Sequence, residues 1–172
     1  MKDLAFTLVE LLVVMTIILV LAGLILATSS YVHNKGARSR AEAEIAALSA
    51  ALENYKADNG IYPNDTSVDP RTVVDPSHYQ TASLELYKSL SGDFDADRQP
   101  NAGVTSYFSF KENQLSPPTG NVQFIKDPFG NSYGYSTVGQ TGNGRGYNPT
   151  FDLWSTAGST TAGGKAGWIE NW

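Results

Sequence analysis

The chain has 172 residues, a formal net charge of −5 and no cysteine. The lack of cysteine excludes disulfides, thiol catalysis and cysteine-ligated zinc. The acidic balance does not suit nonspecific nucleic-acid binding, which depends on Lys and Arg, so no nucleic-acid partner is expected.

An apolar stretch from Phe6 to Ala27 opens the chain, and only the residues MKDLA precede it. Glu10 is the one acid of this stretch, and the stretch contains no other charged residue. A helix of this length can cross the roughly 30 Å core of a bilayer. The stretch is longer than the apolar part of an ordinary signal peptide, and its leader is nearly neutral rather than basic. We therefore expect a membrane-spanning helix over residues 6–30.

The flanking charges do not settle the orientation of this helix. Lys2 precedes it, and Lys35, Arg38 and Arg40 follow it. Taken alone, the positive-inside rule would place the following residues in the cytoplasm. A plain membrane anchor and a signal peptide cleaved near residue 30 both remain open on these observations.

Glu10 is the informative residue of the stretch. An ionised carboxylate inside hydrocarbon is costly unless it is paired or lies near the interface. One interpretation places Glu10 at the level of the lipid headgroups, in contact with water. The other pairs it with a positive charge from a second copy of the chain, and cleavage before Phe6 would create such a charge as a new α-amine.

The segment AFTLVE, from Ala5 to Glu10, followed by the apolar run, resembles the signal of type IV pilins and type II secretion pseudopilins. The resemblance implies a leader over residues 1–5, cleavage between Ala5 and Phe6 by a prepilin peptidase, and N-methylation of Phe6. It also implies a single-pass protein of the inner membrane, with residues 31–172 as a periplasmic domain. The family usually has Gly before the cut, where this chain has Ala5.

A helical pattern continues beyond the span. Apolar residues recur at spacings of 4, 3, 4 and 3 at Ala41, Ile45, Leu48, Leu52 and Tyr55. This spacing is typical of a helix that buries one face. The pair Asn59-Gly60 is a stop signal, and Pro63 prevents the helix from resuming. The pattern predicts an amphipathic helix over residues 37–58 and a nearly continuous helix from residue 6 to residue 58.

Residues 61–80 are rich in Pro, Asp and Asn and predict a loop, and the segment that follows predicts a short helix that ends at Gly92. Thr81 or Ser83 is the expected cap. The side chains expected to face inward are those of Leu84, Tyr87 and Leu90.

Three alternating acids, Asp93, Asp95 and Asp97, resemble the beginning of a calcium-binding loop. Calcium prefers several oxygen ligands. The complete pattern requires Gly and Glu where this chain has Arg98 and Val104. The three aspartates are candidate metal ligands, and a solvated acidic loop is the alternative.

Five short segments rich in aromatic and β-branched residues predict antiparallel strands. They are residues 104–110, 121–127, 127–137, 148–156 and 168–172. A turn is expected at Phe129–Ser132, and the Gly-rich residues 137–146 and 155–167 predict flexible loops. The expected fold is α+β and type IV pilin-like, with a long N-terminal helix packed on a small antiparallel sheet and a loop-rich C-terminal region.

Further motifs resemble the major pseudopilins of type II secretion, the G-type subunits. They are LYKSLSG at 86–92, DPFGN at 127–131, YGY at 133–135, FDLWS at 151–155 and the terminal Asn171-Trp172. The resemblance implies a homopolymeric pseudopilus that drives protein export across the outer membrane. Its implied partners are minor pseudopilins, an inner-membrane platform protein and the prepilin peptidase.

The resemblance also implies a calcium site in the loop that follows the FDLWS segment. In this chain that loop, residues 156–167, contains no Asp or Glu. Two hypotheses follow: Asp93, Asp95 and Asp97 replace the missing ligands, or the loop is held without metal.

Enzymatic activity is not expected, because the sequence offers no legible pair of nucleophile and base. It has two histidines, His33 and His78, and no serine in a G-x-S-x-G motif. The alternatives left open are a type IV pilin for adhesion, motility or DNA uptake, a membrane-anchored binding domain that does not polymerise, and a secreted enzyme with an ordinary signal peptide.

Overall fold

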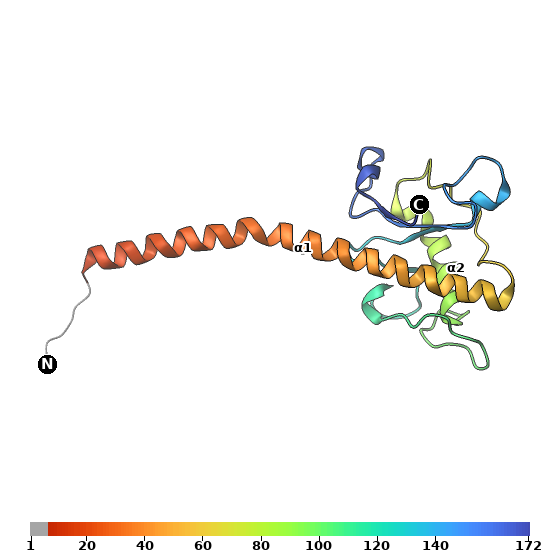
Figure 1. Ribbon diagram of the computed structural model, residues 1–172. Coiled ribbons are helices and arrows are strands. Elements are labelled where there is room, and N and C mark those ends of the chain that lie inside the picture. The colour runs from red at the N-terminus through yellow and green to blue at the C-terminus, as the bar shows by residue number, and fades with distance from the viewer. Residues whose placement is uncertain (1–6) are drawn as a thin grey trace. The chain divides into compact units, whose positions relative to one another are not determined.

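The computed structural model describes residues 7–172, without the side chains of residues 26–30. A long helix, α1 (Leu8–Asn59), is followed by a shorter helix, α2 (Gln80–Ser91), and by short strands (Figure 1). Contacts divide the chain into two compact units between Ala37 and Arg38. We call them the N-terminal unit and the globular unit and describe each by itself. The predicted α+β fold is confirmed.

The predicted continuous helix is confirmed from Leu8 onward, and α1 ends where the sequence indicates. Gly60 has a φ of +78°, and its N–H donates to the carbonyl of Lys56 at 2.8 Å. Glycine adopts this left-handed conformation without strain, which is why it stops helices so often.

The predicted apolar stripe of α1 is the centre of the globular core. Four of its residues are buried and Tyr55 is partly buried against them: Ala41, Ile45, Leu48 and Leu52. They cluster with Leu86 and Leu90 of α2, with Tyr135 and Leu153 of two strands, and with Tyr133, which directly precedes the strand of Tyr135. The stripe therefore faces its own domain, as an amphipathic helix requires.

The helix α2 begins differently from the prediction. A 3₁₀ turn, Pro76–Tyr79, leads directly into α2, and neither Thr81 nor Ser83 caps it. Ser83 is buried instead, where its hydroxyl accepts a hydrogen bond from the N–H of Ile125 at 3.0 Å. The end at Gly92 is confirmed, with a φ of +74° and a hydrogen bond to the carbonyl of Lys88.

The inward face of α2 is nearly as expected. Tyr87 and Leu90 are buried, whereas Leu84 is only partly buried. Leu86 takes the fully buried position.

In the described residues 7–172, five short strands form two antiparallel sheets. The first pairs β1 (Leu115–Ser116) with β2 (Phe124–Ile125). The second has the order β3-β4-β5 and consists of β3 (Gly134–Ser136), β4 (Asp152–Ser155) and β5 (Ile169–Glu170). Its central strand β4 is buried along its whole length, which makes it the main support of the C-terminal region.

One strand prediction was wrong, and one strand was not predicted. Residues 104–110 form no strand, because the N–H groups of Tyr107 and Phe108 both donate to the carbonyl of Leu90 at the end of α2. The strand β1 was missed. The predicted turn lies two residues earlier than expected, since Gly130 donates to the carbonyl of Asp127.

A second apolar cluster, smaller than the first, lies under the loop that follows α1. It contains Val68, Tyr79, Ala82, Trp154 and Trp168. Gly134 makes room for it, because a Cβ at this position would come within 2.0 Å of the Trp154 ring. The two loops predicted at 137–146 and 155–167 each contain a 3₁₀ helix, Val138–Thr141 and Ala162–Gly167.

Candidate functional site

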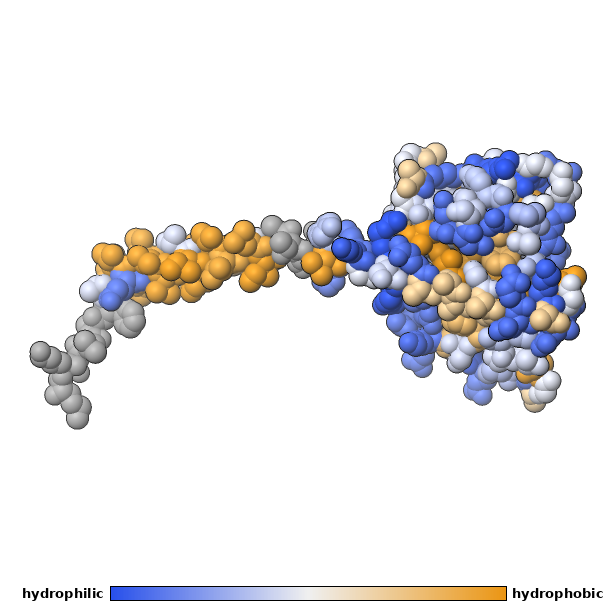
Figure 2. All heavy atoms as spheres, viewed as in Figure 1, coloured by the Kyte–Doolittle hydropathy of each residue, from blue (hydrophilic) through white to orange (hydrophobic). Residues whose placement is uncertain are grey.

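The apolar segment of the N-terminal unit, Leu8–Ile25, is the most unusual surface that the structure describes. Its mean hydropathy is 2.9, and none of it is buried. Its large apolar side chains are between 48% and 81% exposed. Figure 2 shows the segment as an almost unbroken orange surface. By length and composition, this helix can cross a membrane.

The polar groups of this segment are satisfied locally. The backbone bonds to itself along the helix, and the hydroxyl of Thr16 donates to the carbonyl of Leu12 at 2.8 Å. A membrane-spanning segment needs such internal hydrogen bonds, because hydrocarbon offers no partner. The interior of the segment can therefore enter lipid without leaving a polar group unpaired.

Glu10 has a partner within its own chain. Its Oε2 accepts hydrogen bonds from the N–H of Thr7 at 2.9 Å and from the hydroxyl of Thr7 at 2.7 Å. In return, the N–H of Glu10 donates to the Thr7 hydroxyl at 3.2 Å. This reciprocal arrangement is a capping box, which closes the free N–H groups at the start of a helix.

The sequence reasoning missed Thr7, although the motif T-x-x-E before an apolar run is the known signal of a capping box. Both donors of Thr7 bind the same carboxylate oxygen, Oε2. Among the residues that the structure describes, no donor bonds to Oε1 of Glu10. The capping box thus fixes the direction of the carboxylate and leaves one oxygen for a further donor.

Ala5 and Phe6, the predicted processing residues, lie outside the described residues. Cleavage between them, methylation of Phe6 and pairing of Phe6 with Glu10 of a neighbour remain predictions. The structure places Glu10 in the first turn of α1. Positive partial charge at the start of a helix favours a carboxylate there.

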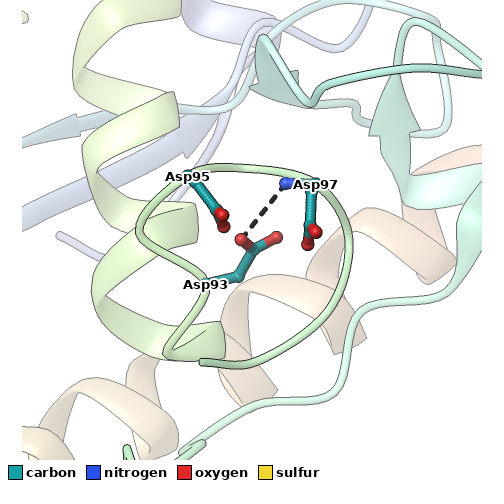
Figure 3. A group of neighbouring side chains, drawn as sticks. All are labelled: Asp93, Asp95 and Asp97. Carbon is teal, nitrogen blue, oxygen red and sulfur yellow. Dashed lines mark hydrogen bonds between the residues drawn. The ribbon is translucent and has the colours of Figure 1, made fainter. Parts of the chain in front are cut away.

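The three candidate metal ligands do lie together. Oxygen atoms of Asp93, Asp95 and Asp97 are all within 4.8 Å of one another, and Figure 3 shows the carboxylates converging inside one loop. Asp93 is buried, whereas Asp95 and Asp97 are exposed. The three aspartates remain candidate ligands, and their side chains differ in what they can offer a cation.

Asp93 is already occupied by hydrogen-bond donors. Its carboxylate accepts from the Tyr87 hydroxyl at 2.6 Å and from the N–H groups of Arg98 at 2.7 Å and Asp97 at 3.2 Å. Burial opposes ionisation, but these hydrogen bonds outweigh it and hold the pKa of Asp93 below its usual value. The neighbouring Asp93 carboxylate in turn raises the pKa of Asp95. Asp93 therefore holds the loop together, and of the exposed pair Asp97 already accepts a hydrogen bond from the N–H of Gln99 at 2.9 Å.

The acid-free loop 156–167 is held by basic side chains. Nζ of Lys165 donates to the carbonyls of Pro70 at 2.6 Å and Arg71 at 2.7 Å, and it lies 5.2 Å from the centre of the Trp168 ring. Arg38 donates to the carbonyl of Gly167 at 2.6 Å. Burial lowers the pKa of Lys165. These contacts agree with the hypothesis that the loop is held without metal.

Two motifs that carried the resemblance meet at one buried carboxylate. Asp127 of DPFGN accepts from the N–H groups of Phe129 at 3.0 Å and Asn131 at 2.8 Å. Its other oxygen accepts from the hydroxyl of Ser155, in FDLWS, at 2.5 Å. Burial raises the pKa of Asp127. These residues therefore fix a turn against β4 rather than form an exposed site.

The terminal motif has the same structural character. The side-chain oxygen of Asn171 accepts from the N–H of Leu153 at 2.8 Å, and its amide donates to the carbonyl of Phe151 at 3.1 Å. Trp172 stacks on Tyr147 with ring centres 4.5 Å apart. The end of the chain is thus fastened to β4 and the loop before it.

Comparison with known protein families gives a match over residues 1–26, to the prokaryotic N-terminal methylation motif. No curated protein matches the chain. The matched motif covers the expected cleavage site, Glu10 and the whole apolar segment Leu8–Ile25. This motif is the signal of type IV pilin-like prepilins, of pili or of pseudopili, which in general are processed by a prepilin peptidase and polymerise.

Proposed function

We propose that this protein is a structural subunit of a type II secretion pseudopilus, which polymerises through its N-terminal helix to drive protein export across the outer membrane. The observation that carries the proposal is the apolar segment Leu8–Ile25, none of which is buried, with Glu10 at its start and inside the matched methylation motif. The G-type motifs favour a pseudopilus over a surface pilus.

The apolar segment has two environments in this proposal. Before assembly it spans the inner membrane, and in the filament it packs against the same segment of other copies. The transfer costs little hydrophobic free energy, because apolar surface is covered in both states. The capping box directs Glu10 in both environments, and its free Oε1 accepts a hydrogen bond from the cleaved α-amine of Phe6 in a neighbouring copy.

Pairing between these two groups would set the register of the filament. A charge buried without a partner in a low-dielectric core is strongly unfavourable, so copies that align their pairs are preferred. The globular unit lies outside the membrane and covers the filament. Minor pseudopilins, an inner-membrane platform protein and the prepilin peptidase are the proposed partners, and the subunit has no enzymatic role.

The mature N-terminus tests this function. Intact-mass and fragment mass spectrometry of the protein purified from membranes is expected to show a chain that begins at Phe6 and carries one methyl group on its amine. An unprocessed chain would contradict the proposal. A chain that begins near Tyr31 would instead support a secreted protein with an ordinary signal peptide.

Deletion of the gene separates the two kinds of filament. We expect proteins destined for export to accumulate in the periplasm, while adhesion, motility and DNA uptake stay normal. The opposite result would assign the subunit to a type IV pilus. Normal export together with normal pilus functions would favour a membrane-anchored binding domain.

A further inference from the structure

The polar end of the N-terminal unit follows directly on the apolar segment. Tyr31 is 69% exposed and Val32 is 65% exposed, and His33 and Lys35 are exposed as well. Within the described residues, no ion pair includes Lys35. The two basic residues that follow differ, because Arg38 donates to the carbonyl of Gly167 and Arg40 lies 3.6 Å from Glu44. Among the side chains described at this end, Lys35 is therefore a cation without an ion pair.

The local sequence supplies no acid to pair with Lys35. No Asp or Glu occurs from Leu11 to Ala41. Helical neighbours lie three and four positions away, and for Lys35 these are Tyr31, Val32, Arg38 and Ser39. An anion that pairs with Lys35 therefore comes from outside this segment.

The spacing along α1 places these residues at a membrane surface. At 1.5 Å per residue, Leu8–Ile25 is about 27 Å long, close to the roughly 30 Å hydrocarbon core. Tyr31 then lies about 9 Å beyond Ile25 and Lys35 about 15 Å beyond it. The headgroup region adds roughly 5–8 Å on each side of the core. Tyr31 thus reaches the interface, and the long side chain of Lys35 can extend back toward it.

Tyr31 and Lys35 also share one helix face, because they are four residues apart. Tyrosine prefers the interface, where its ring meets apolar chains and its hydroxyl meets water. A lysine beside it offers a positive charge at the depth of the lipid phosphates. The two side chains combine one apolar and one cationic contact, which matches the chemistry of an anionic phospholipid.

We propose that Tyr31 and Lys35 form a headgroup anchor that binds an anionic phospholipid and fixes the depth of the subunit in the bilayer. The inference rests on the proposed membrane span. A lysine near an anionic membrane surface strengthens binding on the order of fivefold. Release of this anchor is then a step that every subunit completes before it joins the filament.

Native mass spectrometry of the full chain tests the anchor. The chain is reconstituted in nanodiscs with equal amounts of phosphatidylglycerol and phosphatidylcholine, and the lipids that remain bound are counted. We expect phosphatidylglycerol to exceed phosphatidylcholine by about fivefold, the contribution of one lysine at an anionic surface. Lys35→Gln should bring the ratio close to one. The matched control, Lys111→Gln, removes an exposed lysine of the globular unit and should leave the ratio unchanged.

Flotation of the chain with phosphatidylcholine vesicles tests the membrane span separately from the headgroup anchor. A chain that floats but retains both lipids equally overturns the anchor and leaves the membrane span intact. A preference that survives Lys35→Gln also overturns the anchor, because another cation would then bind the lipid. A chain that does not float with vesicles overturns the span and the anchor together.

Discussion

The two parts of α1 have the same secondary structure and opposite surroundings. From Leu8 to Ile25 the apolar side chains point outward on every side, whereas from Ala41 to Leu52 they form one stripe that is buried. The second part finds its apolar partners in α2 and the strands. The large apolar side chains of the first part are exposed instead. The second part therefore contributes to the core of the globular unit, whereas the first part presents an exposed apolar surface, which the proposed function assigns to lipid or to other copies.

Truncation of one leucine in each part of α1 should give the largest difference in stability. Leu48→Ala removes a buried core side chain, and we expect the free energy of unfolding of the globular unit to fall by about 2–5 kcal/mol. The matched variant Leu19→Ala alters a side chain that is 71% exposed and should leave that free energy unchanged. Thermal unfolding of both full-length variants in detergent measures the contrast. Equal losses would contradict the separation of the two parts.

Replacement of Lys165 should cause the next largest loss of stability. Lys165→Met keeps most of the side-chain volume but removes the hydrogen bonds to the carbonyls of Pro70 and Arg71. Hydrogen bonds to a charged group contribute about 1.5–3 kcal/mol, so the melting temperature should fall clearly. Lys111→Met is the control. If both variants melt alike, the loop 156–167 is not held by Lys165.

Replacement of Asp93 by Asn should lower the free energy of unfolding by about 1–3 kcal/mol, and the size of this loss should depend on pH. Because the folded protein lowers the pKa of Asp93, ionised Asp93 stabilises the fold above its unfolded pKa of about 3.9. This stability is lost as the pH falls through the lower folded pKa. Asp93→Asn should therefore be less stable than the wild type at pH 7, and urea unfolding should show the gap narrowing below about pH 4. A gap that is constant with pH would argue against an ionised Asp93.

Addition of calcium should have the smallest effect on the melting temperature. The oxygens of Asp93 already accept three hydrogen bonds, so the exposed Asp95 and Asp97 would have to hold the ion almost alone. Calcium prefers six to eight oxygen ligands. We expect a calcium titration to raise the melting temperature no more for the wild type than for the double variant Asp95→Asn/Asp97→Asn. A clear rise that only the wild type shows would establish the aspartates as ligands.

The sequence predicts the long elements of this fold well. The stripe from Ala41 to Tyr55 and the stop at Gly60 fix α1, because helix periodicity is set by the geometry of the helix itself. Residues 104–110 were mispredicted as a strand, since their aromatic side chains pack against α2 and the carbonyl of Leu90, near the end of α2, accepts the N–H groups of Tyr107 and Phe108. That contact depends on tertiary structure, which local preference does not contain.

The candidate site was predictable to a similar extent. Glu10 and the three aspartates stand out in the sequence, but the partners that decide their roles do not. The role of Thr7 could have been predicted from the capping-box pattern in the sequence. By contrast, Asp127 lies beside Pro and Gly in a turn motif, and only the fold brings Ser155 to it and buries it.

Assembly of a Glu10 variant tests the central claim most directly. Wild type and Glu10→Ala are expressed at equal levels in the native host, the membranes are isolated, and sheared or overproduced filaments are counted by electron microscopy. We expect Glu10→Ala to insert in the membrane at the wild-type level and to form no filaments, because the Phe6 amine of each neighbour would have no anionic partner. Thr16→Ala, a polar change in the same segment, should assemble normally. Filaments of normal number and length from Glu10→Ala would contradict the account.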